Sequence, residues 1–252
     1  MKILDHFRRG QASASPALPS LPDGLRVYAI GDIHGRLDLL EILLARIADD
    51  DAARGRRKTQ IIFLGDLADR GPDSAEVIER ARGLAAGGAR FLMGNHEELF
   101  LRTIDGDIPA SRVMLRVGGR ETMLSYGVDE EAFEADDEGA LAEMFAARVP
   151  DEHVEFLRGF EDRILLGDYL FVHAGVRPAV PLEEQSPSDL RWIRGEFLDS
   201  EEDHGYIVVH GHTISENVEE RPNRIGIDTG AYASGRLTAL ALEGTARWYL
   251  ET

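Results

Sequence analysis

The sequence has no cysteine among its 252 residues. Disulfide bonds and thiolate metal sites are therefore excluded, and any metal ion has to be bound by His, Asp, Glu or Asn. A chain without disulfides is typical of a reducing compartment, and we predict a cytoplasmic location. No apolar run approaches the ~20 residues that a helix needs to cross a bilayer, so no membrane-spanning segment is predicted.

Basic residues are also scarce. Lys and Arg number 28 against 46 Asp and Glu, which gives a formal net charge of -18. Nucleic acids and anionic membranes both attract basic surfaces, so this charge balance argues against either as a partner. Apolar residues make up 43% of the chain and charged residues 29%, which indicates an ordinary globular protein with a sizeable core. We expect a monomer.

The first residues differ in composition from the rest of the chain. Residues 11–22 are rich in Ser, Ala and Pro, and the ten residues before them lack the apolar centre of a secretory signal. We predict a flexible leader over residues 1–22 and a single folded domain over residues 23–252. Within that domain, residues 103–162 are predicted to be a helical insertion. Its acidic run Asp129–Glu138 is predicted to be a solvated face, with selection of basic substrates as the alternative.

Strands and helices alternate between residues 25 and 93. The sequence predicts strands at Leu25–Ile30, Ile61–Leu64 and Arg90–Met93, with helices at Arg36–Ala48 and Asp73–Ala86. This order is typical of parallel strands in a layered α/β fold, where ligands bind beyond the carboxyl ends of the strands. A second, largely antiparallel sheet is predicted from later strands at Ile164–Leu166, Tyr169–Val172, Tyr206–Val209, Ile225–Ile227, Leu237–Leu242 and Ala246–Leu250.

Polar side chains gather where the predicted strands end. Helix capping would explain one such loop, but it explains three adjacent loops poorly. The clusters supply carboxylate, amide and imidazole groups, which are the usual ligands of metal ions in a chain without thiols. The candidate metal ligands are Asp32, His34, Asp66, Asn95, His173 and His212.

A ligand set of oxygen and nitrogen without sulfur suits Mn²⁺, Fe or Zn²⁺ better than Ca²⁺ or Mg²⁺. Two ions about 3.5–4 Å apart need one ligand that reaches both. We assign that place to Asp66, because its loop lies between the other two ligand loops of the strand series. Water held between two such ions is deprotonated near neutral pH and becomes a nucleophile. The sequence therefore predicts a hydrolytic site with two divalent ions, of which Mn²⁺ is the first choice.

Five short motifs follow one another in a specific order. They are GD-x-HG from Gly31, GD-x-x-DRG from Gly65, GNHE from Gly94, HAG from His173 and GHT from Gly211. This series resembles the metallophosphoesterase superfamily, and within it the bacterial and phage PPP-type serine/threonine protein phosphatases. The resemblance extends from about residue 26 to residue 242. It implies a four-layer αββα sandwich around a dinuclear metal centre.

The resemblance also implies a division of the ligands between the two ions. Asp32, His34 and Asp66 would bind the first ion. The second ion would be bound by four residues, with Asp66 shared: Asp66, Asn95, His173 and His212.

Further roles follow from the same motifs. The resemblance implies that His96 is the general acid, that Asp69 orients it, and that Arg70 and Asn95 contact the substrate. Arg194, in a predicted short helix over residues 188–198, matches a less regular motif with a second phosphate-binding arginine. The implied activity is hydrolysis of phosphoserine or phosphothreonine in a protein or peptide, by direct attack of a metal-bridging hydroxide.

An alternative activity is symmetrical diadenosine tetraphosphate hydrolysis, or hydrolysis of another small phosphoester. Those hydrolases tend to have ARG, GNHD and GHW where this chain has Asp69 in DRG, Glu97 in GNHE and Thr213 in GHT, so all three positions favour the protein phosphatase. A catalytically silent binding module on the same fold fits the complete ligand set less well. His210, directly before the GHT motif, is predicted to be a strand-end histidine with satisfied hydrogen bonds and not a ligand. Tyr232 is predicted to have a packing or surface role, with a position facing the site as the alternative.

Overall fold

The computed structural model describes residues 18–135 and 137–252. Most of the predicted leader, residues 1–17, lies outside the described residues. Leu21, within that predicted leader, is only 3% exposed, and its backbone N–H donates a hydrogen bond to the carbonyl of Gly244. The N–H of Ser20 donates to the carboxylate of Asp168. The packed chain therefore begins before the boundary predicted at residue 23.

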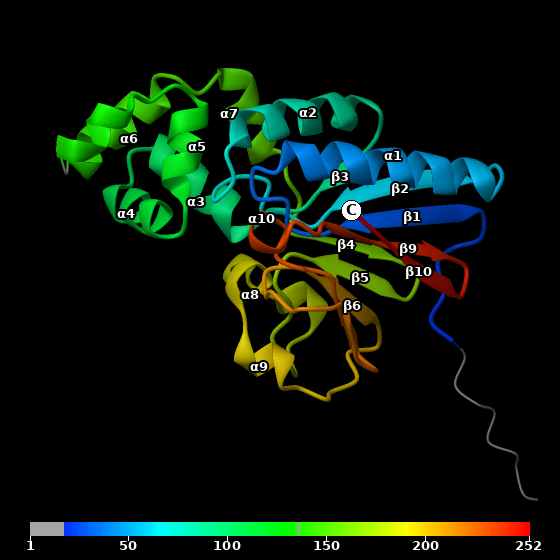
Figure 1. The fold of residues 1–252 in the computed structure, drawn as a ribbon. Helices are drawn as coiled ribbons and strands as arrows, with labels where there is room; N and C mark the ends of the chain where they lie inside the picture. Colours follow the sequence, from blue (N-terminus) through cyan, green and yellow to red (C-terminus); the bar gives the residue numbers. More distant parts are fainter. Residues whose placement is uncertain (1–17, 136) are drawn as a thin grey trace, which may run out of the picture.

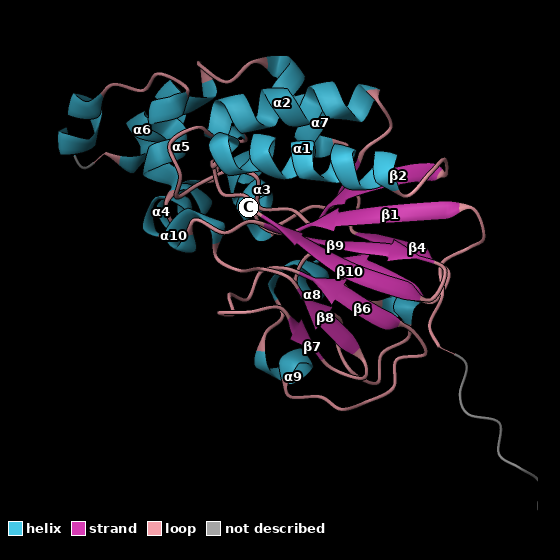
Figure 2. Ribbon diagram, turned by 45° about the vertical axis from the view of Figure 1, so that its right-hand side comes forward, coloured by secondary structure: helices cyan, strands magenta, loops and turns pink. Residues whose placement is uncertain are grey.

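Two five-stranded sheets form the centre of the molecule (Figures 1 and 2). In the first sheet, β1 (Leu25–Ile30), β2 (Lys58–Phe63) and β3 (Arg90–Phe91) run parallel, as the sequence predicts. They are connected by α1 (Leu37–Ala53) and α2 (Ser74–Ala86). These helices lie side by side over one face of the sheet (Figure 1).

The C-terminal hairpin completes the first sheet. It consists of β9 (Thr238–Glu243) and β10 (Ala246–Glu251), and β9 pairs antiparallel with β1. The prediction that this hairpin belongs to the second sheet is wrong. An alternating pattern identifies a strand but does not identify its partner, and here the partner lies at the other end of the chain.

The second sheet is mixed. Its strand order is β4-β5-β6-β8-β7, with β4 (Arg163–Leu166), β5 (Tyr169–Val172), β6 (Ile207–His210), β7 (Glu219–Glu220) and β8 (Arg224–Gly226). The three central strands β5, β6 and β8 are parallel, and only the outer pairs are antiparallel. The prediction of a largely antiparallel sheet is therefore wrong. Long crossover connections between these strands allow the parallel arrangement.

Three hydrophobic cores separate four layers. In β1, Tyr28 and Ile30 pack toward the helices, while Val27 and Ala29 pack toward the second sheet, because alternate side chains point to opposite faces. The third core joins β5 and β6 to two short helices, α8 (Pro187–Trp192) and α9 (Gly195–Leu198). This is the predicted αββα sandwich. The single helix predicted over residues 188–198 is two helices, because the backbone leaves the helical conformation at residues 193 and 194.

A group of helices projects from one side of the sandwich (Figure 1). It contains α3 (Asn95–Ile104), α4 (Ile108–Arg116), α5 (Gly119–Ser125), a 3-10 helix (Glu130–Ala135), α6 (Glu138–Ala146) and α7 (Asp151–Arg158). The helical region thus starts at Asn95, whereas the sequence predicts its start at residue 103. No residue of the acidic 3-10 helix is buried, as expected for a solvated face.

Two more short helices are present, the 3-10 helix Leu182–Glu184 and α10 (Ala231–Ser234). Across residues 18–135 and 137–252, every helix is too short or too polar to pass through a bilayer.

Candidate active site

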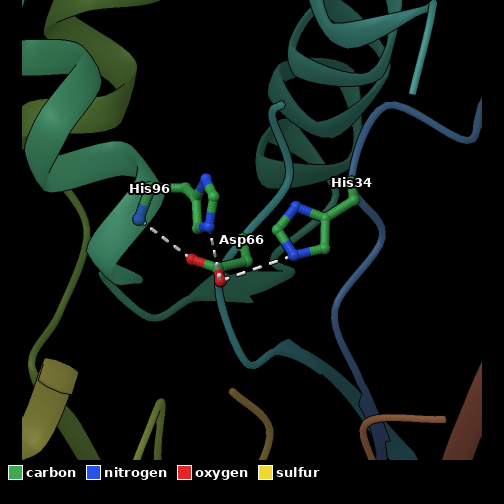
Figure 3. A group of neighbouring side chains, drawn as sticks. All are labelled: His34, Asp66 and His96. Carbon is green, nitrogen blue, oxygen red and sulfur yellow. Dashed lines mark hydrogen bonds and ion pairs between the residues drawn. The ribbon is translucent and has the colours of Figure 1, made fainter. Parts of the chain in front are cut away.

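The carboxylate of Asp66 lies at the centre of a buried cluster beyond the end of β2. Its Oδ2 atom is 3.4 Å from Nε2 of His173, 3.6 Å from Nε2 of His34 and 3.8 Å from Nε2 of His96. Figure 3 shows this carboxylate between the rings of His34 and His96. Two groups of three possible metal ligands share Asp66: His34, Asp66 and His96 in one, and Asp66, His173 and His212 in the other. This is the position that a ligand shared by two ions requires.

The hydrogen bonds of two histidines determine which ring nitrogen faces the cluster. Nδ1 of His34 is 2.8 Å from the carbonyl oxygen of Ala68, and Nδ1 of His173 is 2.8 Å from that of Leu64. A carbonyl only accepts, so Nδ1 carries the hydrogen in both rings. In the neutral ring Nε2 then carries the lone pair and faces Asp66, which is the usual arrangement of a metal-ligating histidine.

The remaining predicted ligands lie in the same cluster. The Oδ1 atom of Asn95, at the start of α3, is 3.0 Å from Nε2 of His173. Nδ1 of His212, which follows β6, is 3.2 Å from the same nitrogen. Asp32, which follows β1, accepts a hydrogen bond of 3.0 Å from the N–H of His212. All six predicted ligands are thus brought together from five separate segments of the chain.

Burial and the charges of neighbouring groups shift the pKa values of the clustered residues in both directions. Burial and neighbouring carboxylates raise the pKa of Asp32 well above its usual range. Burial, followed by the charge of His173, lowers the pKa of His212 to about 2. Burial alone would raise the pKa of Asp66, but the imidazoles of His173 and His96 outweigh it and hold this pKa well below the usual range.

Three buried atoms of the cluster have no hydrogen-bond partner within residues 18–135 and 137–252. They are Oδ1 of Asp32, Nε2 of His34 and Nε2 of His212. Buried polar atoms in folded proteins nearly always have a partner, and each of these atoms can donate a lone pair to a metal ion. The donor set therefore fits a pair of divalent cations, with Asp66 between them.

His96 is bound differently from the other histidines. Its Nδ1 is 2.6 Å from Oδ2 of Asp69, and its Nε2 is 3.2 Å from a guanidinium nitrogen of Arg70. Burial alone would lower the pKa of His96, but the charges of Asp66 and Asp69 raise it overall. Neither contact is to a proposed metal ligand. A guanidinium only donates, so Nε2 accepts in the contact with Arg70. His96 acts as a proton donor only when Nε2 is protonated and Arg70 has turned from it, while the bond from Nδ1 to the carboxylate of Asp69 keeps the ring in place.

Arg70 is held at the site by an aromatic ring. Its guanidinium carbon lies 4.7 Å from the ring centre of Tyr232, and that ring also packs edge-on against His34, with 5.6 Å between ring centres. Tyr232 is 37% exposed, so it is partly open to solvent. Tyr232 thus packs against two site residues, a position that the sequence gives only as the alternative to a packing or surface role elsewhere.

Arg194 lies at the rim of the site. It is exposed, and its NH1 atom is 3.4 Å from the hydroxyl oxygen of Thr213, directly after His212.

His210 is outside both groups of possible ligands. Its ring packs against Phe197, Nδ1 lies 3.0 Å from the carbonyl oxygen of Gly211, and burial lowers its pKa to about 4. The predicted satisfied histidine is confirmed at Nδ1 only, because the buried Nε2 has no hydrogen-bond partner among the described residues.

The backbone is strained at the same place. A positive φ is unfavourable for residues with a side chain and tends to occur at functional sites. Among the described residues, six other than glycine have a positive φ, and five of these six belong to the site: His34, Asp66, Asp69, Arg70 and His212.

Glu97 holds the loop that carries Asp66. Its fully buried carboxylate accepts hydrogen bonds from the N–H groups of Asp66 at 2.7 Å, Leu67 at 2.7 Å and Gly94 at 3.1 Å. Burial and the charge of Asp66 raise the pKa of Glu97 to about 7, while the N–H donors act in the opposite direction. A Glu three residues after a helix cap is a recognisable capping signal. Its hydrogen bonds to the loop of Asp66 and Leu67 cannot be recognised from the local sequence.

We expect Glu97→Gln to destabilise the protein by about 1–3 kcal/mol, because either orientation of the amide places an NH₂ group against N–H donors. Urea unfolding of the metal-free protein would measure the loss. Glu143→Gln, at an exposed position of α6, is the matched control and should change stability little. Equal stabilities of the two variants would contradict the stabilising role of the hydrogen bonds to Glu97.

Comparison with known proteins agrees with this geometry. The family model for calcineurin-like phosphoesterases matches residues 25–237. A symmetrical bis(5'-nucleosyl)-tetraphosphatase from Methylococcus capsulatus is 34% identical over 62% of this chain, but the match spans only 45% of that relative. The asymmetrical bis(5'-nucleosyl)-tetraphosphatase PrpE from Bacillus velezensis is 26% identical over 83% of this chain and 86% of its own length.

A crystal structure of a proposed diadenosine tetraphosphatase has a similar fold. Its TM-score is 0.63 at 22% identity, and the match covers 90% of this chain and 93% of that chain. The matched residues include all six clustered ligands, the three parallel strands β1, β2 and β3, and the whole second sheet. The chain belongs to the family of calcineurin-like phosphoesterases.

Proposed function

We propose that this chain is a metal-dependent hydrolase of dinucleoside polyphosphates, which cleaves a phosphorus–oxygen bond within the polyphosphate. The observation that supports this proposal is the match to PrpE, because it extends over most of both chains and that relative is named an asymmetrical bis(5'-nucleosyl)-tetraphosphatase. The relatives thus favour the activity that the sequence motifs place second.

The residues of the cluster have separate tasks in this proposal. Asp32, His34, Asp66, Asn95, His173 and His212 would hold two divalent ions, with Mn²⁺ as the first choice. Two bound ions would supply an activated water and neutralise charge on the phosphoryl group. Arg70 would bind phosphoryl oxygens from inside the site and Arg194 from its rim, because guanidinium groups pair well with phosphate.

Hydrolysis of phosphoserine or phosphothreonine is a second candidate, and one contact favours it. The 2.6 Å bond between Asp69 and His96 prepares a proton donor for the leaving group. A serine alkoxide is strongly basic and needs such a donor, whereas a nucleotide phosphate is a better leaving group and needs it less. Monomeric state, cytoplasmic location and the lack of nucleic-acid or membrane partners stay predictions.

Diadenosine tetraphosphate should have a higher kcat/KM than a phosphoserine peptide when both are assayed with Mn²⁺. We expect this because the relatives are named as bis(5'-nucleosyl)-tetraphosphatases, and because Arg70 and Arg194 can pair with the phosphates of the substrate. Chromatography of the products would also reveal the position of cleavage, because two ADP molecules mark the symmetrical reaction and ATP with AMP marks the asymmetrical one. An Asp66→Asn preparation controls for contaminating hydrolases. A higher kcat/KM for the phosphopeptide would transfer the assignment to the second candidate.

A further inference from the structure

The carboxylate of Asp69 is held at both of its oxygens. Oδ2 is 2.6 Å from Nδ1 of His96, and Oδ1 accepts a hydrogen bond of 2.6 Å from the hydroxyl of Thr122. Asp69 and Thr122 are fully buried, and His96 is 1% exposed. Without water to replace either bond, the position of the imidazole depends on the position of this carboxylate.

Thr122 holds the backbone of Asp69 as well as its side chain. The N–H of Asp69 is 2.8 Å from the hydroxyl oxygen of Thr122 and 3.0 Å from that of Ser74. One hydroxyl thus donates to the carboxylate and accepts from the amide of the same residue. The two hydroxyl oxygens are themselves 3.0 Å apart, and both residues are fully buried. Asp69 is therefore restrained at its backbone and at its side chain by the same contact.

This restraint acts on a strained segment. Asp69 and Arg70 both have φ of 71°, in the left-handed region that residues with side chains avoid. The N–H of Arg70 donates a 2.9 Å hydrogen bond to the carbonyl of Gly118. A Cβ atom at Gly118 would lie 2.7 Å from Cγ of Arg70, so only glycine fits there. Residues 118–122 thus hold two consecutive site residues in an unfavourable conformation.

Ser74 begins α2 of the sandwich, whereas the other two supporting residues come from the projecting helices. Gly118 lies between α4 and α5, and Thr122 lies within α5 (Figure 1). The sequence predicts this region only as an insertion beside the site.

We propose that Thr122 is a positioning residue for proton transfer by His96. Through this residue, α5 contributes to the geometry of the active site. The proposal rests on the role of His96 as proton donor given above. Loss of the Thr122 hydroxyl would leave Oδ1 of Asp69 buried and unpaired, and the carboxylate would turn away from the geometry that orients the imidazole.

Three variants test this role. Thr122→Val removes the hydroxyl at nearly constant volume, and Thr122→Ser keeps it. Thr103→Val is the matched control, because Thr103 in α3 is also buried but its hydroxyl has no partner among the described residues. A phosphoserine peptide and p-nitrophenyl phosphate are suitable probes, since only the first has a strongly basic leaving group.

Thr122→Val should lower kcat on the phosphoserine peptide by about 10- to 100-fold and kcat on p-nitrophenyl phosphate much less. Thr122→Ser and Thr103→Val should remain close to the parent protein on both probes. A merely structural role of Thr122 would slow the two probes equally, and that result would overturn the proposal. If instead His96→Asn lowers kcat on the two probes by the same factor, His96 is not the proton donor, and the proposal for Thr122 is overturned with that role.

A second readout does not depend on turnover. In protein loaded with diamagnetic Zn²⁺, the hydrogen on Nδ1 of His96 should give a proton resonance far downfield, because its bond to Asp69 is short and buried. This resonance should shift or broaden in Thr122→Val but not in Thr103→Val. An unchanged resonance would overturn the proposal. If the parent protein does not hydrolyse the phosphopeptide, this measurement decides the role of Thr122 by itself.

Discussion

Removal of divalent metal ions is expected to abolish hydrolysis, and Mn²⁺ is expected to restore it. Six side chains from five segments converge on one buried cluster, and three of their donor atoms lack any partner among the described residues. Carboxylates and imidazoles buried in this way are costly unless something balances them. Elemental analysis of the purified protein should find about two ions per chain, as dinuclear hydrolytic sites hold. Full activity of metal-free protein would contradict the proposed centre.

Asp66→Asn should be the most damaging single change among the ligands. The carboxylate of Asp66 belongs to both groups of possible ligands, so its loss disturbs both sites at once. Changes in outer partners of a metal cost about 10–100-fold in affinity or activity, and a shared ligand should exceed the upper end of that range. Asp49→Asn, at an exposed position of α1, is a control with the same change of charge. Equal metal content and activity in the two variants would exclude Asp66 as the shared ligand.

The sequence predicts the parts of the site that depend on local pattern. Asp32 and Asp66 follow apolar runs that become parallel neighbours in the first sheet, so their convergence follows from strand order. The alternating elements also predict a layered α/β fold, whereas the four-layer αββα sandwich is expected from the resemblance of the five motifs. The place of β9 is not, because its pairing with β1 joins opposite ends of the chain and no local pattern encodes it.

The supporting contacts of the site are the least predictable. Thr122 is one threonine in a helical stretch, and nothing nearby in the sequence indicates that its hydroxyl reaches Asp69, 53 residues away. Tyr232 is a second example, because its contacts with Arg70 and His34 join segments that are far apart in the sequence. Motifs reveal which groups perform chemistry, whereas the residues that hold those groups are identified only by tertiary contacts.

His96→Asn should reduce kcat far more on a phosphoserine peptide than on p-nitrophenyl phosphate. The leaving serine alkoxide needs a proton as its bond to phosphorus breaks, and a positioned imidazolium contributes about 10²–10⁴-fold to such a step. The p-nitrophenolate ion is stable without that proton. Diadenosine tetraphosphate should respond like p-nitrophenyl phosphate, because its leaving group is a nucleotide phosphate. The three substrates together therefore separate proton donation from phosphate binding.

Asp69→Asn should show the same selectivity with a smaller loss, because Asp69 acts only through its 2.6 Å bond to His96. Both variants should retain their metal ions, since neither residue is a proposed ligand, and elemental analysis would verify this. The contact of Arg70 with Nε2 of His96 places the imidazole beside the group that would bind phosphate. If His96→Asn slows all substrates by one factor with metal content intact, His96 stabilises the phosphoryl group or the nucleophile. In that case the bond from Asp69 would keep the imidazole of His96 protonated and oriented, so that its positive charge stabilises the phosphoryl group or the nucleophile. Proton donation by His96 to the leaving group would be excluded.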